Sequence, residues 1–574
     1  MALLFFPLAK ILVLHSSFFD LGIFESISHR IASTNDWRLS LAAGHAHGFY
    51  LLYGWLYGQV PSWAVPYFLV GLQAILLAVP VLWFFRRFGA FAAFVYVAYY
   101  PVWVNAFFDF HFDHLAVPLL LVFYMALLDQ RIGWAVLSPT LLMLVKEPFA
   151  LETAACGGLL LWAAIHGKSV WGQPQDQISK RKLLLGALWL TGVGSWYFIF
   201  TTHYLIPYFG FNGGQGFQGG EVFGWLGHGL GDMMITIVTR PHIVILEIIA
   251  TPGKLIYLGV VFGLLAFIPL LRPAFLIPAL PMVAIAMLSR VPNHYDYNTH
   301  YTAGLIIPVM FAFLYGLPRA ERIWERALTW MGLRWRLGGG GRKSGVNLVL
   351  QSNGNYAPSP QPSPVEGEGD KQNGLFGRLG IGFSTVDGRV RLFYMLLFGW
   401  ILLGHIMLSP SPISRLFWSD KVWSYSWRAY VPTEREAMMK MAMEKYIPAS
   451  PDVSVTTQNT VNWSHLANRK VYLPYPLGIA EPHKVMDWSN RTWDGFWEFV
   501  RTGYRPPAIA HDHYADYIVL DLKRPYFLMD RGCEWIYGGC RNKEMEKKFL
   551  DWVAYTRSIY ETVFEQDGFM ILRR

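Results

Sequence analysis

The sequence predicts an α-helical polytopic membrane protein with a separate α/β domain at its C-terminal end. Of its 574 residues, 53% are hydrophobic and only 15% are charged, so the apolar surface is too large for one soluble core. The net charge of +9 comes from basic residues between apolar stretches, the pattern that orients a protein in a bilayer. Nucleic acid is therefore not the expected partner; the membrane lipid is.

The apolar stretches predict about eleven membrane-spanning helices, several of them shorter than the ~20 residues that cross the hydrocarbon layer. Basic residues fall in every second loop, so the positive-inside rule places those loops in the cytoplasm and the intervening loops outside. The stretches lie near 1–19, 62–85, 88–108, 115–128, 131–147, 149–166, 183–209, 256–271, 274–289, 303–317 and 392–409.

The composition divides the chain into four parts. We expect a helical bundle with outer loops over 1–317 and its last helix at 392–409. Between them, 318–391 is a basic cytoplasmic insertion, and its segments GGGGRKSG and PSPQPSPVEGEGD are too poor in apolar residues to fold. Residues 410–574 are expected to form an extracytoplasmic soluble α/β domain, in which ADYIVLDL suits a buried central strand.

Two local features of the C-terminal part carry further expectations. Thr433 and Glu436 have the spacing of a capping box, which predicts a helix that begins there. Cys533 and Cys540 flank a short stretch and either close a disulfide loop or stay two thiols.

Two carboxylates follow the first apolar stretch, in the segment HSSFFDLGIF and the glutamate after it. Asp20 and Glu25 would lie at the boundary between hydrocarbon and water, where a half-dry carboxylate has a raised pKa and can act as general base toward a hydroxyl. Alternatively, Asp20 caps a helix that begins at Leu21. The two roles do not exclude each other.

Four ionisable side chains crowd the segment FDFHFDH between two apolar stretches. In an extended segment Asp109, His111 and Asp113 share one face, whereas a helix would pair Asp109 with Asp113 and His111 with His114. Either geometry offers nitrogen and oxygen ligands for a divalent metal such as Mg²⁺ or Mn²⁺. A hydrated turn is the alternative.

Lys146 and Glu147 end another apolar stretch, and the proline after them disfavours helical backbone at Glu147. Adjacent residues do not face each other on a helix, so each of the two needs a partner elsewhere. Lys146 could hold a phosphate as a point charge. Pairing of this dipeptide with Asp109 or Asp113 is the structural alternative.

Two further loops carry candidate substrate ligands. His45 and His47, in GHAHGFY, share one side of an extended segment and suit a metal or a phosphate, or they are ordinary loop histidines. In NHYDYNTHY, His300 and Tyr301 belong to a mixture of donors and aromatic faces that suits a sugar or a phosphate. The same mixture equally suits an interfacial aromatic belt.

The chain resembles a bacterial family of predicted polytopic membrane proteins of unassigned function. The motifs that carry the resemblance are FDLGIF, a histidine twelve positions before a tyrosine (His45 and Tyr57), PSWAVPYFLVGLQAILLAVP, DFHFDHLAVPLLL, LVKEPFALE, the HY pair at 300–301 and ADYIVLDL. The family looks related to the GT-C superfamily of integral-membrane glycosyltransferases. In that superfamily a carboxylate in the first outer loop activates the acceptor, and the donor is usually a polyprenyl-phosphate sugar.

The resemblance implies a GT-C-like bundle in the bacterial inner (plasma) membrane that transfers a sugar from a polyprenyl-phosphate donor to an envelope acceptor. Asp20, with Glu25, would be the general base. Family members more often carry an acidic residue and a glutamine where this chain has Glu25–Ser26, so Asp20 is the stronger candidate. The residues expected to bind substrate are His45, Lys146, Glu147, His300 and Tyr301, and those expected to hold the metal are Asp109, His111 and Asp113.

Two other classes of protein fit the same composition. A transporter or flippase for a lipid-linked or small polar substrate would use buried charges for coupling, but the internal repeats typical of transporters are not visible in the sequence. A non-catalytic envelope assembly protein would act through its outer domain. The sequence has no GxxxxGK[ST] motif, dinucleotide fingerprint, HExxH motif or CxxC pair, so ATP hydrolysis, nicotinamide chemistry and zinc proteolysis find no support.

Overall fold

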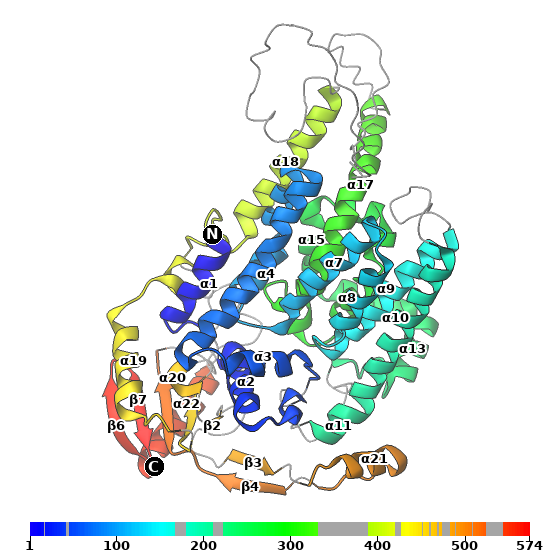
Figure 1. Ribbon diagram of the computed structural model, residues 1–574. Helices are drawn as coiled ribbons and strands as arrows, with labels where there is room; N and C mark the ends of the chain where they lie inside the picture. Colours follow the sequence, from blue (N-terminus) through cyan, green and yellow to red (C-terminus); the bar gives the residue numbers. More distant parts are fainter. Residues whose placement is uncertain are drawn as a thin grey trace, which may run out of the picture.

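The computed structural model is mostly helical, with a small sheet near the C-terminal end of the chain (Figure 1). The cysteine pair Cys533 and Cys540 and most of the expected insertion lie outside the residues that it describes. The structure describes residues 1–574 except 17, 42–44, 167–178, 211–221, 331–387, 420–425, 451, 459–460, 468–469, 473–482, 488–489, 508 and 524–542.

Among the described residues, five helical segments are long and apolar enough to cross a membrane. They are Ser62–Phe88, Glu147–His166, Lys180–Phe209, His300–Trp330 and Gly388–Leu408. Two sharply bent helix pairs raise the number to as many as seven, Ala90–Ala98 with Tyr100–Phe107 at 55° and Gly231–Thr239 with Pro241–Ala250 at 88°. Eleven spans are therefore not confirmed, because several predicted stretches form apolar helices of only 10–17 residues.

The described residues between 1 and 408 form the helical bundle, in which short turns connect many of the helices. The helices are α1 (Ala2–Leu12), α2 (Ile23–Thr34), α3 (Phe49–Tyr57), α4 (Val65–Phe88), α5 (Ala90–Ala98), α6 (Tyr100–Phe107), α7 (Ala116–Leu128), α8 (Ile132–Leu142), α9 (Glu147–His166), α10 (Lys180–Phe200), α11 (Ile206–Phe209), α13 (Leu230–Thr239), α14 (Pro241–Ala250), α15 (Pro252–Val261), α16 (Leu280–Leu288), α17 (Ala303–Trp330) and α18 (Gly388–Leu408). The turns that matter for the site are η1 (Phe18–Gly22), η2 (Trp37–Leu41), η4 (Phe112–Leu115), η9 (Pro292–Tyr295) and η10 (His300–Thr302).

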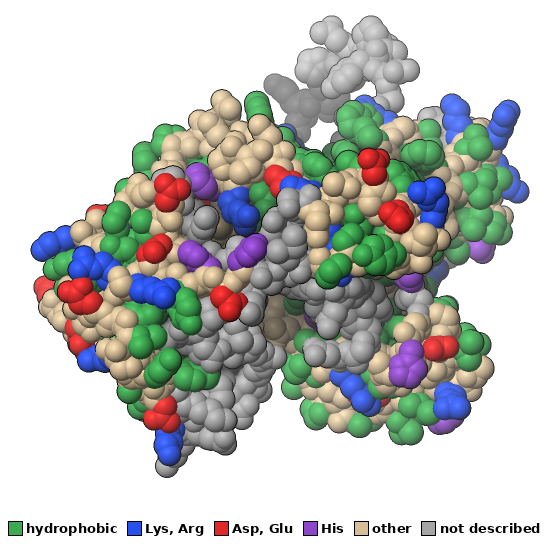
Figure 2. Space-filling view, turned by 90° about the horizontal axis from the view of Figure 1, so that it is seen from below, with side chains coloured by type: hydrophobic (Ala, Val, Ile, Leu, Met, Phe, Trp, Pro, Cys, Tyr) green, Lys and Arg blue, Asp and Glu red, His purple; other side chains and the backbone are tan. Residues whose placement is uncertain are grey.

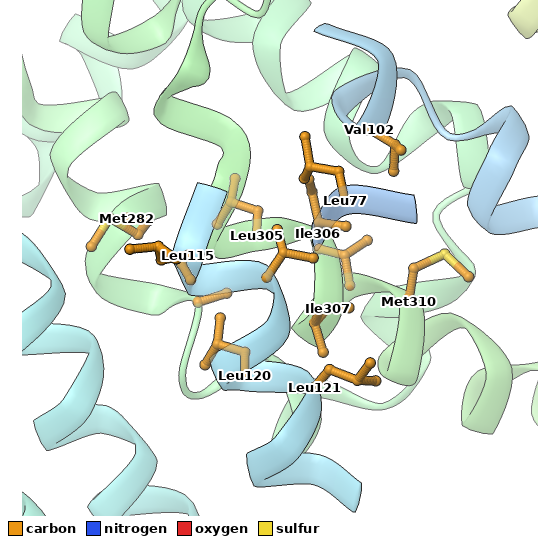
Figure 3. Close-up of a cluster of buried hydrophobic side chains, with 14 of the residues drawn as sticks. Leu77, Val102, Leu115, Leu120, Leu121, Met282, Leu305, Ile306, Ile307 and Met310 are labelled. Atoms are coloured by element: carbon orange, nitrogen blue, oxygen red, sulfur yellow. The ribbon is translucent and has the colours of Figure 1, made fainter. Parts of the chain in front are cut away.

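Helix α17 forms the centre of the bundle. In the most apolar window of its span, 83% of the residues are buried, against 22% for α18 at the periphery. A helix that is apolar on every side has to be surrounded by other helices. Figure 3 shows the contact region, where side chains of α17 meet those of α4, α6, α7 and α16; the labelled residues are Leu77, Val102, Leu115, Leu120, Leu121, Met282, Leu305, Ile306, Ile307 and Met310.

The predicted boundary at 317 is not a structural boundary. Helix α17 continues without interruption through Pro318 to Trp330, so the first part of the expected insertion extends a helix of the bundle. The expected last span at 392–409 is confirmed as a helix, since α18 covers almost the same residues.

The C-terminal part builds a five-stranded mixed sheet in the order β2-β1-β5-β7-β6, beside a two-stranded sheet of β3 and β4. Strand β5 is buried at every residue and lies in the middle, as the apolar run ADYIVLDL predicts. The capping box of Thr433 and Glu436 starts α19, as expected. The bounds are α19 (Glu434–Tyr446), β1 (Ser454–Thr457), α20 (Ser464–Ala467), β2 (Lys470–Tyr472), β3 (His483–Asp487), α21 (Trp493–Thr502), β4 (Ile509–His513), β5 (Tyr517–Asp521), α22 (Lys543–Ile559), β6 (Glu561–Gln566) and β7 (Phe569–Arg573).

The C-terminal sheet packs against the chain that links α1 to η1. Leu14 is fully buried in the same apolar cluster as Met439 of α19 and Val455 of β1. The ammonium group of Lys440 donates a hydrogen bond to the carbonyl oxygen of Leu12. The sheet therefore anchors the segment that leads directly to Asp20.

Candidate functional site

Asp20 lies in the π-helical turn η1, immediately before α2. The residue that precedes the first turn of α2 is Gly22, and no side chain caps this helix. Asp20 therefore does not act as the helix cap that was one alternative. Its Oδ1 atom instead lies 3.2 Å from Nε2 of His111, and its side chain is 21% exposed.

His111 lies in the loop between α6 and η4, and its two ring nitrogens face different oxygen atoms. Nδ1 is 3.2 Å from the carbonyl oxygen of Asp109, so this nitrogen carries a proton. Burial by itself would lower the pKa of His111, but the Asp20 carboxylate, its hydrogen bond and the charge of Asp113 outweigh burial and raise that pKa. The raised pKa favours the protonated ring, whose Nε2–H would donate to Asp20.

His300 stacks on His111, with ring centroids 3.6 Å apart and an angle of 19° between the ring planes. It comes from η10, at the start of the span that α17 continues. Its Nε2 atom is 3.9 Å from Oδ1 of Asp113. Neither nitrogen of this buried ring has a hydrogen-bond partner among the described residues. A buried imidazole without a partner is available to a ligand that supplies one.

Lys146 brings a positive charge to the same cluster. Its ammonium group lies 5.3 Å from the centre of the Tyr301 ring, and that ring is 4.3 Å from the ring of His300. Burial would lower the pKa of Lys146, but Asp113, Tyr301 and Glu147 together raise it. The side chain, which is only 6% exposed, therefore keeps its charge.

The backbone break between α8 and α9 is stabilised by contacts with residues 45–47. Oε1 of Glu147 is 2.5 Å from Nδ1 of His45, and Oε2 accepts a hydrogen bond from the backbone N–H of Ala46 at 3.0 Å. Nδ1 of His47 lies 2.7 Å from the carbonyl oxygen of Val145. Lys146 and Glu147 thus find separate partners, as their adjacency requires.

His294, one of the polar residues of the NHYDYNTHY motif, also belongs to the cluster. Its ring lies 5.0 Å from that of Tyr301, and burial together with the charges of Lys146 and His45 lowers the pKa of His294 to about 4. It is therefore neutral at pH 7. The NHYDYNTHY motif carries the signal for this residue, since His294 is its first ionisable side chain.

The three expected metal ligands do not converge on one point. Asp109 forms an ion pair with Lys10 of α1 at 3.0 Å, His111 faces Asp20, and Asp113 faces His300. Within the described part of the chain, no three His, Cys, Asp or Glu side chains are grouped as a metal site would need. A requirement for metal stays a prediction.

Glu25 lies apart from this cluster, on α2, which packs against α3. Its side chain is fully buried, and neither carboxylate oxygen has a hydrogen-bond partner among the described residues. Burial raises the pKa of Glu25 to about 8, and its charge would act on Tyr57 and Tyr67. The structure thus gathers Asp20, His45, His111, Asp113, Lys146, Glu147, His300 and Tyr301, and separates Glu25 and the Asp109 side chain from them.

The apolar helices and this buried polar cluster define a multi-pass membrane protein. The chain belongs to the family described as predicted membrane protein (DUF2079), whose model matches residues 10–336. That range includes every residue of the cluster. No curated protein and no solved structure matches the chain.

Proposed function

We propose that this protein is an integral-membrane glycosyltransferase that moves a sugar from a polyprenyl-phosphate donor to an envelope acceptor. The proposal places the reaction at the outer face of the bacterial inner membrane, with the C-terminal sheet outside. The observation that carries it is the chain of contacts from Asp20 through His111 to His300, with Lys146 close by. These residues come from four separate parts of the sequence.

The division of charge in the cluster suits such a transfer. Asp20 is partly exposed and lies beside His111, where its carboxylate could accept the proton of an acceptor hydroxyl as that oxygen attacks the sugar. The bond between the sugar and the phosphate oxygen breaks, and negative charge develops on the lipid phosphate. Lys146 and the imidazoles of His111 and His300 would stabilise this charge.

A divalent ion would enter this site with the donor. Mg²⁺ is commonly bound by one or two carboxylates together with substrate phosphates, and it keeps several of its waters. Asp20 or Asp113 could supply such a carboxylate without a preformed set of protein ligands. A membrane-embedded site also fits a polyprenyl donor, because that lipid cannot leave the bilayer.

A transporter or flippase is the second candidate, favoured by the two sharply bent helix pairs, since broken helices are common at transport sites. A single substitution separates the classes. We expect Asp20→Asn to lower sugar transfer by about 10²–10⁴-fold while the donor still binds, because only the base is lost. A transport function predicts that the wild type has no transferase activity and that Asp20→Asn alters substrate flux. An assembly role predicts that Asp20→Asn behaves like the wild type.

The test is a transfer assay with radiolabelled polyprenyl-phosphate sugars and the purified full-length protein. Asp129→Asn, the same chemical change at the residue that ends α7 and lies outside the polar cluster, is the matched control and should keep full activity. Transfer by Asp20→Asn at the wild-type rate would overturn the role of Asp20. Absence of transfer by the wild type with every donor would overturn the proposed function.

A further inference from the structure

A cleft of about 580 Å³ lies between residues 34–38, where α2 ends and η2 begins, and the start of α21 in the C-terminal part. Helices α2, α11 and α21 lie at the same end of the molecule, and Figure 2 views this end with charged and histidine side chains scattered among hydrophobic ones. The volume falls in the range of ligand sites, about 300–1,000 Å³. The lining residues are Thr34, Asn35, Asp36, Trp37, Arg38, Phe209, Arg491, Thr492 and Trp493.

Aromatic rings form one wall of this cleft. The indoles of Trp37 and Trp493 stack with centroids 5.0 Å apart and planes 15° from parallel. Phe209 meets both rings edge-on, at 5.0 and 5.3 Å. Stacking covers one face of each indole, yet Trp493 keeps 47% of its surface exposed. An exposed indole face beside a cleft is a flat apolar platform, which suits the C–H face of a sugar ring.

Polar groups line the rest of the cleft and are held in place. Arg38 binds Asp36 through two parallel contacts of 2.8 Å and donates to the carbonyl oxygen of Arg491 at 3.4 Å. Arg491 is 2% exposed, with its guanidinium 5.3 Å from the centre of the Tyr208 ring. Asn35 ends α2 in the left-handed conformation, at φ 54°. The lining has two arginines against one aspartate, so its formal charge is positive.

An apolar cluster that includes the lining residue Phe209 packs beside the cleft. Phe496 of α21 is fully buried against Tyr208 and Phe209 of α11. This cluster fixes α21, and with it Trp493, to the helical bundle. A preorganised site of this kind loses little freedom when it binds a ligand.

We propose that this cleft binds a glycan that carries carboxylate or phosphate groups. The indole platform would stack on a sugar ring, Asn35 and Thr492 would bond its hydroxyls, and Arg491 would attract its anionic group. The chain runs from Arg38 to His45 in seven residues, so the cleft lies within about 25 Å of the polar cluster. A bound glycan would be the acceptor of the transfer, a role that rests on the proposed function, whereas binding itself does not.

The experiment measures binding of the full-length protein, in lipid nanodiscs, to an array of natural neutral and anionic glycans, followed by titration calorimetry with the strongest binder. We expect anionic glycans to bind best. Trp493→Ala should weaken binding at least tenfold, and Arg491→Gln should abolish the preference for anionic over neutral glycans. Trp497→Ala removes a similarly exposed indole of the same helix, 54% against 47% for Trp493, that does not line the cleft, and should change binding less than twofold.

Asn35→Gly guards against loss of the fold, because glycine accepts the left-handed backbone at this position. It should weaken glycan binding three- to tenfold with an unchanged unfolding midpoint. No binding to any glycan, or equal losses in Trp497→Ala and Trp493→Ala, would overturn the site. If the wild type binds the glycan but transfers no sugar, the proposed function fails and the glycan site stands.

Discussion

Two neighbouring regions of the molecule bury acidic side chains in opposite ways. In the polar cluster each carboxylate faces a histidine: Asp20 with His111, Asp113 with His300, and Glu147 with His45. Between α2 and α3, Glu25 has no partner among the described residues, and the hydroxyl groups of Tyr50 and Tyr53 have none either.

The difference separates acids that have a side-chain partner from an acid that has none among the described residues. A cation or a hydrogen-bond donor beside a carboxylate favours its ionised form, whereas burial without a partner favours the neutral acid. Both regions contain acids at the end of the same bundle, so the presence of an acid alone does not mark the site. The partner side chain does.

The largest expected effect comes from breaking the buried ion pair that supports the polar cluster. Lys10→Met removes the cation that donates to Asp109 at 3.0 Å and to the carbonyl oxygen of Phe107 at 3.3 Å. Loss of one partner of a buried pair costs about 3–5 kcal/mol, so the midpoint of thermal unfolding in detergent should fall sharply. Lys10→Met combined with Asp109→Asn should recover most of the loss, and an unchanged midpoint for the single variant would contradict the pairing.

The second prediction uses pH to test the region without partners. The pKa of Glu25 is about 8 in the folded protein and near 4.5 when unfolded, so the folded state is favoured below pH 4.5 and loses stability as pH rises toward 8. Glu25→Gln removes this loss. Relative to wild type, the variant should gain about 4 kcal/mol of unfolding free energy at pH 8 and almost none at pH 4.5.

The measurement is the difference in unfolding midpoint between Glu25→Gln and wild type across this pH range. Glu444→Gln, the same change at an exposed position of α19, serves as the control and should show no such trend. An equal difference at both ends of the range would mean that Glu25 has a partner in the folded protein.

The smallest effect concerns the charge of Lys146, which we propose binds the lipid phosphate of the donor. Lys146→Met should weaken binding of a polyprenyl-phosphate sugar by roughly 10–100-fold, because a hydrogen bond to a charged group contributes about 1.5–3 kcal/mol. Lys146→Arg keeps the charge and should retain most of the affinity. If both variants bind the donor as wild type does, the phosphate lies elsewhere.

Much of the fold follows from local patterns, and the candidate site follows in part. The capping box at Thr433 and the central apolar strand are confirmed because neighbouring residues determine them. The residues of the cluster could be identified as candidates because ionisable groups at membrane boundaries are uncommon. Their side-chain partners could not, since the ion pairs of this region join residues far apart in the sequence: Asp109 is paired with Lys10, 99 positions away.

By itself, the sequence determined that this chain is a membrane protein with a C-terminal sheet, because hydrophobic composition and periodicity are properties of consecutive residues. Only the tertiary structure decided which acids belong together. Asp20 and Glu25 are five positions apart and equally acidic, but η1 turns one toward His111 and α2 turns the other into its packed face. That choice depends on how distant helices pack, because a carboxylate takes its charge state from the groups that surround it.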